Sequence, residues 1–153
     1  MLLRPARYRD DESVGEFLDR LSPDSRLRRF FNPLPYVSPA LTRKMVTNAP
    51  GHLVLLAIDE QDVVGHGMAV CIGERAADVG IVVADAYQRQ GIGSRLLAQL
   101  TDTTAAVGVT TLCCDVLSEN YLVLDWLRRA LPGIRFRRSG STMSARWVNL
   151  AQR

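Results

Sequence analysis

The sequence predicts an α/β fold, an α+β sandwich built on one central mixed sheet. Helix-like and strand-like segments are interspersed along the chain, and this mixed order is typical of helices packed on a shared sheet. The chain has 153 residues, of which 47% are apolar, so it can bury a core of its own without a disulfide or a metal. No linker, repeat or low-complexity stretch divides it, and we expect one domain over residues 1–153.

The first third of the chain predicts one strand followed by helices. Polar residues mark the helix starts, because Ser or Asp at an N-cap satisfies free N–H groups and proline suits the first helical position. The predicted elements are a strand over 2–7, a helix from Asp10 to about Leu21, a helix from Ser22-Pro23 to near Phe31, and a helix from Ser38-Pro39 to about Asn48.

The rest of the chain alternates between apolar strands and amphipathic helices. The predicted strands are 52–59, 63–72, 77–84 and 110–117, followed by a terminal hairpin of 134–138 and 141–148. A helix from Gly91 to about Val107 places Ile92, Leu96, Leu97, Leu100 and Val107 on one face. A helix from Asn120 to Leu131 aligns Tyr121, Leu124, Leu127 and Leu131.

Composition excludes several classes of function. The formal net charge is +3, and the arginines are interleaved with acids, so we expect no nucleic-acid partner. The N-terminus lacks an apolar signal region, and the longest apolar run, 53–58, is far shorter than a membrane span. We therefore expect a cytoplasmic protein with no membrane partner. Cys71, Cys113 and Cys114 are expected to be reduced, packed thiols, and their spacing to the histidines predicts no metal site.

A glycine-bearing turn between a valine-rich strand and a helix predicts a phosphate site. The segment 81–97 reads IVVADAYQRQGIGSRLL. N–H groups at a helix start lack intrahelical partners and lie at the positive end of the helix dipole, and Gly91 and Gly93 leave room for a ligand. A P-loop would need Lys and Ser or Thr where Ser94-Arg95 stand, and a dinucleotide fingerprint would need glycine at Leu96.

The run from Gln88 to Gly93 matches Q/R-x-x-G-x-G/A and resembles the acetyl-CoA pyrophosphate loop of the GNAT superfamily of N-acetyltransferases. The resemblance covers nearly the whole chain. It implies a mostly antiparallel mixed sheet of about six to seven strands flanked by about four helices, with two parallel strands splayed apart to bind acetyl-CoA. The cofactor-binding residues that it implies are Ile81, Val82 and Val83 for the pantetheine arm, Gln88, Arg89, Gln90, Gly91, Ile92, Gly93 and Ser94 for the pyrophosphate, and Asn120. Asn120 is equally explained as a helix-starting residue.

The segment 21–31, LSPDSRLRRFF, resembles the N-terminal helical segment of the Pat-type protein lysine acetyltransferases. In that branch a glutamate near the start of the valine strand is the proposed general base, and Asp78 lies at its position. A carboxylate there would take a proton from the protonated lysine amine. Asp78 has a structural alternative as the partner of Arg75 or another arginine. His66 is the other candidate base, although a core or groove-wall role is favoured for it.

The tyrosine general acid of many GNAT enzymes has no counterpart here, because Leu127 stands near its place and Tyr121 lies too early. Cys113 or Cys114 as a nucleophile is disfavoured, since no histidine is near in sequence.

Three functions remain open. The first is transfer of acetyl from acetyl-CoA to a protein lysine, the second is the same transfer to a small amine, and the third is an acyl-CoA-binding sensor with little or no turnover. Arg26, Arg28 and Arg29 would line the acceptor side, where they disfavour a polycation and suit an acidic protein patch. The chain is expected to be a monomer or a homodimer.

Overall fold

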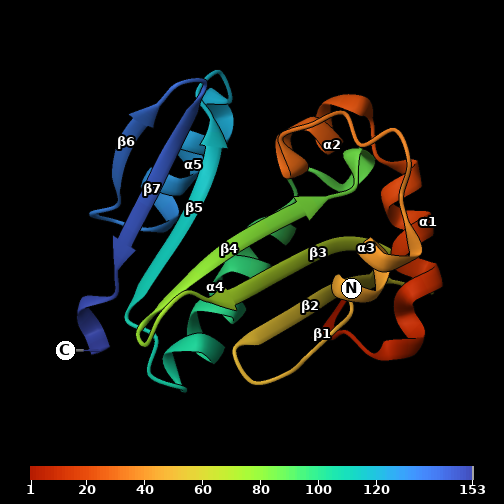
Figure 1. The fold of residues 1–153 in the computed structure, drawn as a ribbon, viewed down its shortest axis with the longest axis horizontal. Coiled ribbons are helices and arrows are strands. Elements are labelled where there is room, and N and C mark those ends of the chain that lie inside the picture. Colours follow the sequence, from red (N-terminus) through yellow and green to blue (C-terminus); the bar gives the residue numbers. More distant parts are fainter. Residues whose placement is uncertain (153) are drawn as a thin grey trace.

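One mixed sheet of seven strands forms the centre of the computed structural model, which describes residues 1–152 (Figure 1). The strand order is β1-β2-β3-β4-β5-β7-β6, and every neighbouring pair is antiparallel except β4 and β5, which are parallel. The strands are β1 (Leu2–Pro5), β2 (His52–Asp59), β3 (Asp62–Cys71), β4 (Ala76–Val83), β5 (Thr111–Leu117), β6 (Arg135–Ser139) and β7 (Thr142–Val148). The predicted fold class is confirmed.

Within residues 1–152, five α-helices flank the sheet, one more than the resemblance implied. They are α1 (Asp11–Arg20), α2 (Pro23–Phe30), α3 (Pro39–Lys44), α4 (Ile92–Ala105) and α5 (Tyr121–Ala130). Short 3-10 turns lie at Tyr8–Asp10, Asp85–Tyr87 and Leu150–Gln152. No helix within residues 1–152 is long and apolar enough to cross a membrane.

The helices bury opposite faces of the sheet because side chains alternate along each strand. On β2, Val54 and Leu56 pack with α1 and α3, whereas Leu55 and Ala57 pack with α4. The C-terminal strands pack against α5 on the α4 side, around Val116. In the described part of the chain, the α1–α3 face of β5, β7 and β6 therefore has no helix over it (Figure 1).

Two of the three predicted helix caps are present. Ser22 accepts a hydrogen bond from the Ser25 N–H, and Ser38 accepts one from the Leu41 N–H, both at 3.1 Å. Asp10 does not cap α1, which corrects that prediction. Its carboxylate accepts instead from the Arg7 N–H (2.6 Å) and from the Arg4 guanidinium, which holds the Asp10 pKa below its usual value.

Three side chains predicted to be packed are exposed. The helical period, extended past Ala105, predicted that Val107 would lie on the buried face. The helix ends at Ala105, however, and the turn that follows buries Val109 and leaves Val107 75% exposed. Tyr121, the first residue of α5, is 71% exposed, although Leu124, Leu127 and Leu131 are buried as predicted. Cys71 is exposed because it ends β3, where its N–H donates to the Gly51 carbonyl.

Candidate active site

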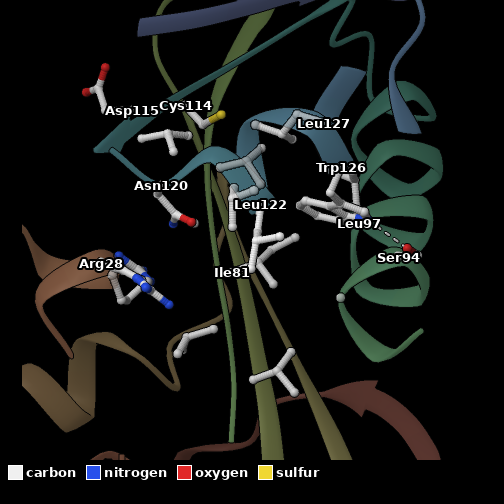
Figure 2. A pocket seen from close by; sticks show the side chains of 18 of the residues that line it. Arg28, Ile81, Ser94, Leu97, Cys114, Asp115, Asn120, Leu122, Trp126 and Leu127 are labelled. Carbon is white, nitrogen blue, oxygen red and sulfur yellow. Dashed lines mark hydrogen bonds between the residues drawn. The ribbon is translucent and has the colours of Figure 1, made fainter. Parts of the chain in front are cut away.

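The sheet opens between its two parallel strands. β4 and β5 are paired only over Ala76–Asp78 and Thr111–Cys113, and they separate beyond these residues. A cavity of about 660 Å³ fills the resulting gap and extends between α2, α4 and α5 (Figure 2). The strands diverge toward their carboxyl ends, so the paired residues close one end of the cavity.

Free main-chain groups of β4 line this gap. Alternate residues of a strand turn their N–H and C=O groups to opposite neighbours. The Ala84 N–H donates to the Val64 carbonyl of β3 (2.8 Å), whereas the Arg75 carbonyl accepts from the Thr111 N–H of β5 (3.1 Å). The main-chain N–H and C=O groups of even-numbered β4 residues therefore point to β3, and those of odd-numbered residues point to β5. Beyond the paired segment, the residues whose main chain is turned to the gap are Val79, Ile81 and Val83.

This alternation separates the three strand residues implied for the pantetheine arm. Ile81 and Val83 direct main-chain groups into the gap, and the Val83 carbonyl already accepts from the Gln88 side chain (3.0 Å). Val82 turns its main chain to β3 and buries its side chain with α1. Val79, which sequence reasoning did not select, directs its main-chain groups into the gap, whereas Val82 lines the cavity without doing so.

The turn after β4 builds an anion cradle at the open end of the cavity. Arg89 and Gly91 both adopt left-handed backbone angles, with φ of 63° and 86°. Gly91 caps α4 without a side chain, and within residues 1–152 no hydrogen bond uses the N–H groups of Ile92, Gly93 or Ser94. Unpaired N–H groups at a helix N-terminus favour a phosphate.

An apolar wall from α4 and α5 faces the cradle. Trp126 lies across from Gly93, and its indole N–H donates to the Ser94 hydroxyl at 2.9 Å (Figure 2). Leu97, Val116 and Leu127 continue this wall, which can cover the apolar part of an elongated ligand. Trp126 was missed because a tryptophan in an amphipathic helix is usually core.

The α2 side of the cavity is polar. Arg28 and Arg29 approach from α2, while Asp78, Asp115 and Asn120 come from the sheet and the turn after it. Asn120 is buried and makes no side-chain cap bond to α5, so its side chain is directed at the cavity rather than at the helix start (Figure 2).

Arg29 is packed against β4 without a polar partner for its Nε atom. Its guanidinium lies over Gly80, where a Cβ would come within 2.6 Å of the Arg29 Cζ. Burial lowers the Arg29 pKa, and the charge of Asp78 opposes this shift. Arg26 is different, because it bonds the carbonyls of Leu18, Asp19 and Leu34. Arg26 is therefore a structural residue and does not line the acceptor side as predicted.

The environment of Asp78 suits a proton acceptor. Partial burial raises the pKa of its carboxyl, the Asp115 carboxylate raises it further, and Arg29 lowers it. None of the four ion pairs found within residues 1–152 involves Asp78, so the predicted pairing with Arg75 is not formed. Its carboxylate stays exposed at the closed end of the cavity.

The other candidate groups have structural surroundings. His66 is fully buried, its Nε2 lies 2.8 Å from the Met45 carbonyl, and burial lowers its pKa to about 4. Burial raises the pKa of Cys114 to about 12, which suppresses the thiolate. Tyr121 does not line the cavity, and the Tyr87 hydroxyl, which does, donates to Asp59 at 2.9 Å.

Most of the predicted site residues meet at this one cavity. Those that line it are Asp78, Ile81, Val82, Val83, Gln88, Arg89, Gly91, Gly93, Ser94 and Asn120. Two do not line it with their side chains: Ile92 is buried in the core below α4, and the Gln90 amide donates to the Ala86 carbonyl. Within residues 1–152 no three His, Cys, Asp or Glu side chains gather as a metal site.

A mixed sheet parted between parallel strands, with an anion cradle at the open end, defines a binding site for a long ligand that carries phosphate. Residues 16–130 match the model of the acetyltransferase (GNAT) family. This chain belongs to that family.

Individual relatives agree with this assignment. An acetyltransferase of Pseudomonas aeruginosa is 30% identical over 114 residues, which are 71% of this chain and 61% of that protein. The chain thus spans about 61% of the length of this curated relative. The GNAT domain of S. lividans PAT superposes with a TM-score of 0.89 at 22% identity, covering 95% of this chain and 89% of that one. The PaiA N-acetyltransferase of Thermoplasma acidophilum, solved with coenzyme A, superposes at 0.80 and 14% identity, covering 96% and 98%.

Proposed function

We propose that this protein transfers the acetyl group of acetyl-CoA to a primary amine of a protein lysine. The observation that carries the proposal is the gap between β4 and β5, which connects an anion cradle at one end to the Asp78 carboxylate at the other. From Val83 to Asp78 the strand spans about 17 Å, so one extended ligand arm would run along it from the cradle to the carboxylate.

The residues of this chain fit acetyl-CoA part by part. The unpaired N–H groups of Ile92, Gly93 and Ser94 would hold the pyrophosphate. The free main-chain groups of Val79 and Ile81 would bond the amides of the pantetheine arm, against the apolar wall that includes Trp126. Acetyl-CoA supplies the activated acetyl thioester, and this placement brings it to the closed end of the cavity.

Asp78 is proposed as the general base. A lysine amine is protonated near neutral pH, with a pKa of about 10.4, and must lose its proton before it attacks. The raised pKa of Asp78 moves this carboxyl group toward the working pH, where a general base is most effective. Aspartate is a short side chain. The proton therefore passes from the lysine amine to Asp78 directly if the amine lies close, and otherwise through one water. We propose that the thiolate leaves into solvent, since Tyr87 already donates its hydroxyl proton to Asp59.

A protein acceptor is supported by the polar α2 side of the cavity. Arg28 and Arg29 border it, and neither belongs to an ion pair within residues 1–152. Two cations outside any ion pair on this side of the cavity disfavour a polyamine and favour a lysine in acidic surroundings.

Thiol release from acetyl-CoA tests the proposal. Purified protein would be incubated with acetyl-CoA and either lysine-containing proteins, polyamines or free amino acids. Release with a protein, accompanied by a mass increase of one acetyl group on a lysine, is the expected result. Release only with small amines would assign a small-molecule acetyltransferase. Acetyl-CoA binding without release on any acceptor would instead assign an acyl-CoA sensor.

A further inference from the structure

The open face of β5, β7 and β6 carries a row of side chains that leads away from Asp78. The register pairs Asp78 with Cys113, Cys113 with Arg146, and Arg146 with Arg135. Residues directly opposite in neighbouring strands point to the same face. With strands about 4.8 Å apart, Arg146 lies about 10 Å from β4 and Arg135 about 14 Å.

Arg135, Arg137 and Arg146 form a positive patch on this face, which we call the arginine patch. Arg137 lies opposite Ser144 and is therefore the diagonal neighbour of Arg146. All three side chains are exposed, and none belongs to an ion pair within residues 1–152. Like charges directly opposite each other in a sheet are destabilising, so the Arg135–Arg146 pair carries a cost that a bound anionic group would relieve.

We infer that the arginine patch is the docking surface for an acidic segment of the protein acceptor, next to the lysine that enters the cavity. This inference rests on the proposed function and adds the class of acceptor. A peptide that places its lysine amine at Asp78 and runs across β5 and β7 brings carboxylates within reach of Arg146 and Arg135 after a few extended residues. Exposed charge pairs of this kind add modest affinity and speed association.

Two other occupants fit this face less well. A second copy docked by a two-fold axis would set arginine against arginine. A single-stranded nucleic acid would need aromatic side chains on which bases stack. The other strand residues that the register places on this face are not aromatic: Thr111, Cys113, Asp115, Leu117, Ser139, Thr142, Ser144 and Val148.

Peptide binding measured by fluorescence anisotropy tests the inference without requiring catalysis. The protein, saturated with CoA, would be titrated with a labelled peptide that has one lysine followed by six Asp or Glu residues, and with a matched peptide carrying Asn and Gln. We expect tighter binding of the acidic peptide, with the difference shrinking as salt is raised. The double variant R135S/R146S should weaken acidic-peptide binding about three- to tenfold at low salt.

Arg138→Ser is the matched control. Like Arg135→Ser alone, it removes one positive charge from β6, but Arg138 lies opposite Met143 and points to the α5 face. It should retain the preference for the acidic peptide, and the CoA affinity of each variant checks that it folds. Equal affinity for both peptides, equal losses in the single variants R138S and R135S, or tighter binding of a single-stranded oligonucleotide would overturn the inference. Acidic-peptide binding without acetyl transfer would overturn the proposed function and leave the docking surface standing.

Discussion

The chemistry proposed here depends on one carboxylate. Asp78→Asn keeps the shape of the side chain but removes the proton acceptor, so kcat should fall by about 10²- to 10⁴-fold. Acetyl-CoA affinity should stay unchanged, because Asp78 lies at the end of the cavity away from the cradle. Steady-state kinetics with calorimetry on the same samples measures both quantities. If kcat survives the substitution, Asp78 is not the base.

The charges around Asp78 should set the pH dependence of the reaction. The base works only when deprotonated, so kcat/KM falls as pH drops through the Asp78 pKa. Asp115 raises this pKa and Arg29 lowers it. Asp115→Asn should therefore move the acidic limb of the profile to lower pH, and Arg29→Met should move it to higher pH. Shifts in the same direction, or none, would contradict the assignment.

At the scale of elements, Ser22 fixes α2 to the turn after β4. It caps α2, and its N–H and hydroxyl also donate to the Asp85 carboxylate at 3.0 and 2.7 Å. Ser22→Ala should cost about 1–2 kcal/mol of unfolding free energy in a urea titration. Ser38→Ala is the control, because within residues 1–152 the Ser38 side chain caps α3 and bonds no other element, and it should cost less. Equal losses would show that the Asp85 contacts add nothing.

The same contacts make a pH prediction. Burial acts to raise the Asp85 pKa, but hydrogen bonds from Ser22 and Ser25 outweigh it and hold the pKa below its usual value. A lowered folded-state pKa contributes stability above the unfolded pKa, and this contribution is lost as pH falls through the folded pKa. The difference in stability between wild type and Ser22→Ala should therefore shrink below about pH 4. A difference that grows on acidification would contradict this account.

Local signals predicted the elements well, because they depend on neighbours in sequence. The bounds of β2 were predicted to the residue, and Ser22 and Ser38 cap the helices that follow them. Some errors had no signal in the local pattern. The helical period did not show that α4 stops before Val107, and nothing local showed that Arg26 bonds carbonyls eight residues away.

The site was predictable where it lies in one segment and unpredictable where strands meet. The loop from Gln88 to Ser94 is continuous, and its spacing predicted a phosphate site. Trp126, which bonds Ser94 across 32 residues, had no local signal. The main chain of Val79, rather than that of Val82, points to the gap because of the register between β4 and β3. The row of side chains from Asp78 to Arg135 depends on three further strand pairings.

For the whole molecule, the gap between β4 and β5 predicts that the ligand stabilises the fold. The two parts of the sheet are joined at this point by only three registered residue pairs, so a ligand filling the gap would bridge them. Acetyl-CoA at about 100 times its Kd should add about 2.7 kcal/mol to the unfolding free energy. That corresponds to a rise in Tm of about 5–10 °C for a domain of this size. Pantetheine, which lacks the pyrophosphate, should raise Tm less, and equal shifts would argue against the cradle.

Calorimetric titration of acetyl-CoA into wild type, Gly91→Ala and Gly140→Ala tests the central claim most directly. Both glycines have positive φ, 86° and 60°, and an added Cβ at either meets nothing within 4 Å, so the two substitutions carry similar strain. Only Gly91 shapes the cradle, whereas Gly140 turns between β6 and β7. We predict that wild type and Gly140→Ala bind alike and that Gly91→Ala binds at least about tenfold more weakly. No binding by wild type, or equal binding by both variants, would contradict the account.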